Sequence, residues 1–248
     1  MPLNPSFLAT DDYHLNVSRG LTKHASSLFK FGYSANVGST VTETVWDGGT
    51  AYTYPAVSNT VVVTSDGGAS DSGLQILVSG LDANYAELEE TVTLSALGTA
   101  NTGNTFSRVF RSYNAGSTEM NSVTDYMVLQ MSGSTVAQFS GEDEQTLMAV
   151  YTVPAGKTLY IKRAMVSSGT ENGNRFIRAS LVARRDGGVF RTAAKFSLKY
   201  SSFDGVFEYP LAFPAKTDIE VRAITSSSTA EVAASFEGVL IDEAQYLD

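Results

Sequence analysis

Apolar and polar residues alternate in short runs along most of the chain, and turn-forming residues separate the runs. In one such run, Ile219, Val221 and Ala223 alternate with Glu220 and Arg222. Successive side chains of a β-strand point to opposite faces, so this period of two predicts strands with one buried and one solvated face. The pattern is typical of antiparallel sheets, and no long amphipathic helix follows residue 34 to support a βαβ architecture. We therefore predict an all-β fold built from antiparallel β-sandwich or jelly-roll-like domains.

Acidic residues dominate the middle of the chain. The 248 residues carry a net charge of −9, yet residues 34–140 hold ten acidic side chains against only two basic ones, Arg108 and Arg111. Residues 141–248 hold 14 acidic and 12 basic side chains. The change in composition near residue 140 predicts two domains, an acidic β-sandwich over residues 34–140 and a jelly-roll-like β-sandwich over residues 141–248.

The first 33 residues lack the alternation. Residues 2–16 contain two prolines and no clear period, which predicts an extended N-terminal arm, and residues 21–30 are predicted to form a short helix. The arm is too apolar to remain in solvent, so we expect it to dock either on its own domain or on a neighbouring subunit. The candidate docking residues are Phe7, Leu8, Tyr13, Leu15 and Val17.

Residue types that carry catalysis are scarce. The chain has no Cys and only two His, both within the first 33 residues, and it lacks a Gly-x-Ser-x-Gly turn and a phosphate-binding glycine loop. Nucleophilic catalysis needs a base beside the nucleophile, so we predict that the protein is not an enzyme and uses no cofactor. The acidic field disfavours nucleic acid as a partner, and no apolar run is long enough for membrane insertion.

Clustered carboxylates leave two alternatives open. The stretches 87–90 and 142–144 could supply the acid pair of a glycoside hydrolase, although solvated acidic surface explains them more simply. Residues 66–71 bring two Asp side chains close together, as a calcium site would require. This segment lacks the alternating ligands of a calcium loop, however, and its Asp-Gly-Gly sequence is typical of a turn.

Three aromatic residues around a turn form a candidate ligand platform. Trp46, Tyr52 and Tyr54 flank the turn sequence at residues 47–49. Exposed rings in this arrangement could stack on the apolar face of a host-surface sugar, whereas buried rings would close one end of a sandwich. Both interpretations stay open at this point.

Basic residues gather among the strands of the second half. They are Arg178, Arg184, Arg185, Arg191, Lys195 and Lys199. They could pair with the acidic first half of another copy, which would give head-to-tail electrostatic complementarity, or they could be scattered surface charge.

Several phrases of the sequence resemble a group of tailed-phage virion proteins, many of them from marine phages. They include residues 43–49 (Glu-Thr-Val-Trp-Asp-Gly-Gly), residues 145–157 and residues 213–222, and the resemblance extends over nearly the whole chain. It implies a structural protein of the virion, assembled in the host cytoplasm, whose partners are other virion proteins and copies of itself. It transfers no catalytic residue. We expect a tail- or neck-attached component present in multiple copies; the alternatives are a head (capsid) decoration protein and a carbohydrate- or receptor-binding module.

Overall fold

The strands predicted from the alternating pattern are present throughout the structure. The computed structural model describes residues 12–169, 176–199 and 202–243, and in this part of the chain sixteen strands are accompanied by one short α-helix, α1 (Tyr13–Ser18), and one 3-10 turn, η2 (Gly68–Asp71). All the strand pairings are antiparallel. The predicted all-β fold class is therefore confirmed. None of the helices in these ranges is long and apolar enough to cross a membrane.

The first module consists of two sheets that enclose one apolar core. One sheet has the order β6-β3-β8-β9 and the other β5-β4-β7, and both contribute to the core, for example Val63 from β3 and Ile76 from β4. The strand bounds are β3 (Val62–Ser65), β4 (Gln75–Leu81), β5 (Glu87–Thr93), β6 (Thr99–Asn101), β7 (Arg108–Asn114), β8 (Tyr126–Met131) and β9 (Ser134–Ser140). This arrangement is a β-sandwich.

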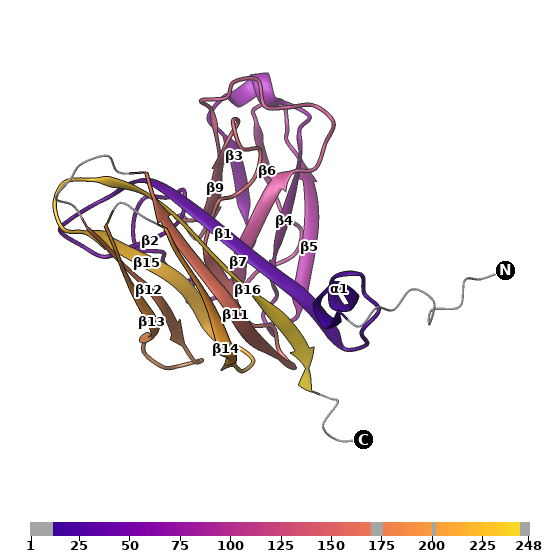
Figure 1. Ribbon diagram of the computed structural model, residues 1–248. Helices are drawn as coiled ribbons and strands as arrows, with labels where there is room; N and C mark the ends of the chain where they lie inside the picture. Colours follow the sequence, from indigo (N-terminus) through magenta and orange to yellow (C-terminus); the bar gives the residue numbers. More distant parts are fainter. Residues whose placement is uncertain (1–11, 170–175, 200–201, 244–248) are drawn as a thin grey trace.

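The second module is also a sandwich, formed by the two ends of the chain. One sheet has the order β1-β16-β11-β14, and the other β10-β15-β12-β13 with β2 beside β15 (Figure 1). Both contribute to a second core that includes Ile161, Leu181 and Phe236. The strand bounds are β1 (Ala25–Val37), β2 (Glu43–Thr44), β10 (Val150–Thr152), β11 (Lys157–Ser168), β12 (Ile177–Arg184), β13 (Arg191–Leu198), β14 (Phe203–Phe213), β15 (Asp218–Thr225) and β16 (Ala230–Asp242).

Strand β1 overturns the prediction for residues 21–30. That stretch does not form a helix, because β1 starts at Ala25 and pairs with β16 over almost its whole length. Residues 25–33 therefore belong to a sheet and not to an arm. The aromatic residues Phe29, Phe31 and Tyr33 alternate along β1 but point away from the core, while Lys30, Gly32 and Ser34 are buried. This inverted pattern concealed the strand.

The chain crosses between the modules at two places. Val45 belongs to the second core and Trp46 to the first, while further along the chain Met148 belongs to the first core and Ala149 to the second. Val37 also lies in the second core, so residues 34–45, predicted to open the first domain, pack with the second module instead.

Candidate functional site

A buried ionic cluster joins the two modules, and it begins with the alternation on β15. Asp218, Glu220 and Arg222 share one face of this strand, opposite the core residues Ile219 and Val221. The alternation predicts a solvated face for Glu220, yet Glu220 is 0% exposed and Asp218 beside it is 3% exposed. Carboxylates this deeply buried require compensating charge and hydrogen bonds.

Asp218 receives compensating charge and hydrogen bonds from strands of both modules. Arg108, on β7 of the first module, donates from Nε to Asp218 Oδ1 over 2.9 Å and from Nη2 to Oδ2 over 3.2 Å. Arg184, on β12, donates to Oδ2 from Nε and Nη2 over 2.9 and 2.8 Å. The Thr152 hydroxyl donates to Oδ1 over 2.6 Å. Asp218 thus fixes one strand from each module to the same carboxylate.

Glu220 is held in a similar way two residues further along β15. Thr44 donates from Oγ1 to Glu220 Oε2 over 2.6 Å, and Arg222 donates from Nε to Oε1 over 2.7 Å. Burial raises the pKa of Glu220, while the Thr44 hydrogen bond and the Arg222 charge counteract part of that rise. Thr44 Oγ1 also accepts from the backbone N–H of Tyr52, which links this carboxylate to the first module.

Aromatic rings cover the guanidinium groups of the cluster. Tyr54 lies beside both Arg108 and Arg184, with 5.4 and 4.7 Å between each guanidinium carbon and the ring centroid. Phe190 covers Arg184 and Arg222 at 4.8 and 4.3 Å. Every oxygen of the two carboxylates accepts at least one hydrogen bond, and each carboxylate is paired with at least one guanidinium group. These contacts suit the cluster to clamping the two modules together.

The candidate ligand platform is part of the first core. Trp46 and Tyr52 are 3% and 6% exposed, and the rings of Trp46, Tyr52 and Tyr54 meet edge to face at 5.1 and 4.8 Å between centroids. Trp46 Nε1 donates to the Thr50 carbonyl over 2.8 Å, and the Tyr52 hydroxyl donates to the Val109 carbonyl over 3.1 Å. The structure therefore corrects the platform hypothesis, because buried rings offer no face to a sugar.

Asp47, next to Trp46, is tied to the second chain crossing. Its Oδ2 accepts from the backbone N–H of Leu147 over 2.6 Å. Burial raises the pKa of Asp47 to about 8. The nearby charge of Asp143 also raises this pKa, whereas the hydrogen bond from Leu147 lowers it. A second polar contact lies nearby on β1, where Lys30 donates to the Phe110 carbonyl of β7, and burial together with Arg111 lowers the pKa of Lys30 to about 7.

The carboxylates considered for calcium hold turns in place. Asp71 is 1% exposed and accepts from the Ser65 hydroxyl and, over 2.8 Å, from the Asn121 N–H. Asp66 Oδ1 accepts from the Tyr126 N–H over 2.6 Å. No group of three or more potential metal-ligating side chains occurs in the described ranges.

The acidic stretches considered for hydrolysis are likewise engaged or solvated. Glu87 pairs with Lys157 of the second module over 2.7 Å, and Glu89 is exposed. Glu90 accepts from the backbone N–H groups of Gly103 and Asn104 over 2.6 and 2.9 Å, which closes a loop. In the second stretch, Glu144 Oε1 accepts from the Met120 N–H over 2.6 Å. These contacts are typical of loop and surface structure.

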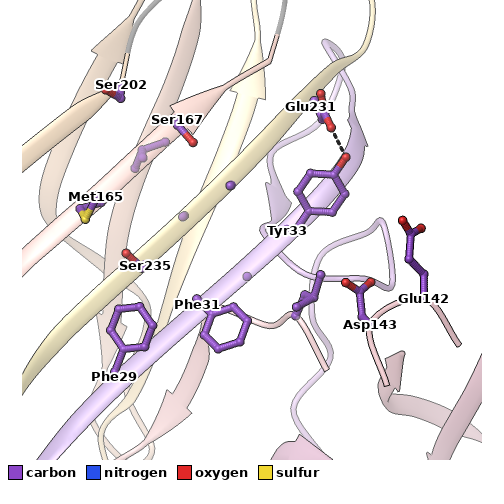
Figure 2. A pocket seen from close by; sticks show the side chains of 15 residues that line it. Phe29, Phe31, Tyr33, Glu142, Asp143, Met165, Ser167, Ser202, Glu231 and Ser235 are labelled. Carbon is purple, nitrogen blue, oxygen red and sulfur yellow. Dashed lines mark hydrogen bonds between the residues drawn. The ribbon is translucent and has the colours of Figure 1, made fainter. Parts of the chain in front are cut away.

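The outer face of the β1-β16-β11-β14 sheet carries an apolar groove (Figure 2). Its volume is about 760 Å³. Phe29 and Phe31 stack along one side with 5.7 Å between ring centroids, Phe29 is 59% exposed, and Met165 lies across the groove on β11. At one end, the Tyr33 hydroxyl donates to Glu231 beside a rim of acidic side chains, Glu142 and Asp143.

The described part of the predicted docking arm lies on the same sheet. Asp12 caps α1 by accepting from the Leu15 N–H over 3.1 Å, and Val17 is buried. Tyr13 and Leu15 remain 46% and 45% exposed. A second hollow of about 570 Å³ lies between α1 and the sheet, and Phe29 lines both hollows. The other predicted docking residues, Phe7 and Leu8, lie outside the described residues.

Comparison with known proteins gives weak structural neighbours and nothing at the level of sequence. No protein-family model matches the chain, and no curated protein matches it. Among solved structures, a mutant VP2 protein of infectious bursal disease virus in derived T=1 particles aligns with a TM-score of 0.28 and 16% identity, covering 91% of this chain and 71% of that chain.

Two further structures from the same virus align with similarly low TM-scores. The Gx strain aligns with a TM-score of 0.26 and 14% identity over 89% of this chain and 72% of that chain. The VP2 subviral particle aligns with a TM-score of 0.25 and 15% identity over 91% and 74%. TM-scores of this size do not establish a common fold, and no function is transferred from these structures.

Proposed function

We propose that this protein is a non-enzymatic structural component of a tailed-phage virion, assembled in multiple copies and attached at the tail or neck. Decoration of the head (capsid) is the alternative placement. The observation that carries the proposal is the combination of a rigid two-module body with an apolar sheet face that is exposed among the described residues. The resemblance of the sequence to tailed-phage virion proteins supports the same role.

Rigidity follows from the ionic cluster. Arg108 binds Asp218 across the junction through two hydrogen bonds, and a bidentate guanidinium–carboxylate pair fixes orientation as well as distance. Burying such charges is costly, so their value lies in holding one relative orientation of the modules more than in net stability. A subunit that repeats in a regular assembly must present its contact surfaces at a constant angle, and the cluster supplies that constancy.

The outer sheet face supplies a surface for neighbours. Phe29, Met165 and Val206 are 59%, 38% and 65% exposed on β1, β11 and β14 of this sheet. Soluble monomers rarely expose large contiguous apolar areas, and such areas commonly mark protein–protein contacts. In an assembled virion, a neighbouring protein would cover this face.

The proposal is tested on purified particles. Quantitative mass spectrometry and immunogold labelling are expected to find the protein as a stoichiometric component of intact virions. A ring-like or fibre-like copy number with gold at the tail or neck supports that placement, and hundreds of copies over the shell support head decoration instead. Absence from purified particles would refute a virion role.

Deleting residues 1–11 tests the docking arm. The deletion leaves α1 and every described strand in place, so circular dichroism and the melting temperature should match those of the full-length protein. We expect the truncated protein to remain folded but to be lost from particles when it competes with full-length protein during assembly. Incorporation at the full-length level would refute a docking role for this segment.

A further inference from the structure

The β12–β13 hairpin presents a group of unpaired cations. Its apolar residues, such as Ile177 and Leu181, face the second core. Five basic residues on or beside the hairpin are exposed, and we call them the basic hairpin: Arg178, Arg185, Arg191, Lys195 and Lys199. None of the five forms an ion pair with another described residue. Arg184, the sixth basic residue of this region, is bound to Asp218 instead.

Strand β13 is also an open sheet edge. It pairs with β12 and ends the sheet order in the described residues. Lys195 lies opposite Ser180 on β12, so it shares the outer face with Arg178. Exposed Phe176 and Val189, 42% and 71% accessible, add apolar surface at the two ends of the hairpin. Charged residues on an edge strand can also serve only to prevent pairing with a strand of another molecule. The experiment below distinguishes that alternative from a specific contact.

The first module carries the opposite charge at one end. Backbone hydrogen bonds join its loops there: the Asp66 N–H donates to the Tyr126 carbonyl over 3.0 Å, the Gly141 N–H to the Asp125 carbonyl over 2.9 Å, and the Glu142 N–H to the Val123 carbonyl over 3.1 Å. These contacts gather four acidic residues, which we call the acidic end: Asp66, Asp125, Glu142 and Asp143.

No basic side chain neutralises the acidic end among the described residues of the first module. Its two arginines lie elsewhere, because Arg108 is buried in the ionic cluster and Arg111 lies over the Tyr113 ring at 5.0 Å. Exposed Val123 and Tyr126, 64% and 42% accessible, accompany the acids. The acidic end therefore has the composition of a contact surface, with charge around exposed apolar residues.

We infer that the basic hairpin of one copy binds the acidic end of a second copy. The inference deepens the proposed function, since it rests on the assembly of several copies and names the surfaces that meet. Within one copy the two surfaces belong to different modules, and in Figure 1 β12 and β13 lie on the far side of the second module from β3 and β6. The unpaired charges must therefore be satisfied by solvent or by another molecule, and a second copy offers both charge and apolar complementarity.

Such a contact is head to tail. Each copy carries one basic hairpin and one acidic end, so every copy can bind one neighbour on each side, and repetition gives a closed ring or an open filament. The ionic cluster between the modules fixes the angle between the two surfaces, and hence the rotation from one copy to the next. A ring of this kind would suit a tail or neck position.

Charge reversal tests the contact in the purified full-length protein. The hairpin variant is Arg178→Glu/Lys195→Glu, and the acidic-end variant is Asp125→Lys/Glu142→Lys. These side chains are exposed or half-exposed, and none of them forms an ion pair with another described residue. Sedimentation velocity at about 50 mM NaCl should show that each variant alone associates at least about tenfold more weakly than the wild type. An equimolar mixture of the two variants should recover association, because both contacts in it again join opposite charges.

A salt dependence and a control variant outside the hairpin complete the design. Raising NaCl to about 500 mM shortens the screening length roughly threefold and should weaken wild-type association by a similar tenfold or more. Lys23→Glu makes the same charge change as Lys195→Glu at an exposed residue outside the hairpin, and it should leave association unchanged. Circular dichroism of each variant verifies folding.

The outcomes separate this inference from the proposed function. Three outcomes refute the contact even if the protein is present in virions. The wild type stays monomeric in all conditions, its association is unchanged by both charge reversals, or mixing the two variants does not restore association. Salt-sensitive binding of the hairpin to double-stranded DNA without self-association also refutes it. Rescue by mixing combined with absence from particles would retain the contact and refute the virion role.

Discussion

Replacement of Asp218 by Asn is the sharpest test of the clamp between the modules. The Asp218 side chain is 4% exposed, and it faces the guanidinium groups of Arg108 and Arg184 together with the Thr152 hydroxyl. An amide has nearly the same shape but no charge, and one of its two polar atoms is a donor. Whichever oxygen is replaced, the new NH₂ group faces hydrogen-bond donors, and two cations lose their shared anion.

The expected cost follows from the burial. Removing one partner of a buried ion pair typically costs about 3–5 kcal/mol, because the remaining charge stays buried without compensation. Arg184 is 30% exposed and regains some hydration, so we expect the lower limit, about 3 kcal/mol. For a chain of this size that loss corresponds to a decrease in melting temperature of about 6–12 °C.

Urea denaturation followed by circular dichroism and by Trp46 fluorescence measures the loss. Asp204→Asn is the matched control, since Asp204 pairs with Arg163 on the surface with side chains 44% and 36% exposed, and it should leave the unfolding midpoint unchanged. If Asp218→Asn prevents folding altogether, Arg184→Gln provides a milder removal of the same contact. An Asp218→Asn midpoint equal to that of Asp204→Asn would refute the clamp.

Three further predictions concern the core and the chain crossings. Asp47→Asn should flatten the pH dependence of the free energy of unfolding. Because burial raises the pKa of Asp47 to about 8 in the folded protein, the contribution of this residue to stability is complete below about pH 4 and is lost as the pH rises toward 8. Urea midpoints across this pH range measure the difference. Gly32→Ala should destabilise by about 1–3 kcal/mol, because an added Cβ would overlap backbone atoms of Ala149 and Val45, and thermal unfolding measures the effect. Trp46→Ala should cost about 3–5 kcal/mol in urea unfolding as a core truncation, and glycan-array signal that is present in the wild type and lost in a folded variant would contradict the core assignment.

The sequence predicts the individual strands better than their partners. Strand β12 alternates Ile177, Ala179 and Leu181 with polar residues, and the alternation alone identifies it. Pairing is different, because Ala25 lies opposite Ile241 in the β1–β16 ladder, and nothing local specifies a partner more than 200 residues away along the chain. The assignment of the N-terminal strand to the second module therefore requires the structure.

Strand β1 was misassigned because its two faces are exchanged relative to the usual pattern. Its aromatic residues line the outer groove, and the buried positions between them, Lys30, Gly32 and Ser34, are polar or small. Lys30 is accommodated there because a β7 carbonyl accepts its hydrogen bond, and Gly32 because the crossing segments pass too close for a side chain. The alternation of Phe29, Phe31 and Tyr33 was present in the sequence as a strand signal. The alternation could not indicate that the first module and the crossing segments cover the polar face.

The same reason accounts for the ionic cluster. Glu220 and Arg222 alternate with apolar residues and were therefore assigned to a solvated face, which is correct for a single sheet in water. The face is buried here because Arg108, 110 residues before Asp218 in the chain, brings a counter-charge from the first module. Convergent buried charges also characterise active sites, so burial alone does not separate the two cases. The pairing separates them here, because guanidinium groups neutralise Asp218 and Glu220 and both oxygens of each carboxylate accept hydrogen bonds from the protein, which is the arrangement of a structural clamp. It follows that the charges of Asp218 and Arg108 are coupled, so Asp218→Asn should cost less stability in a variant that also lacks the Arg108 charge than in the wild type.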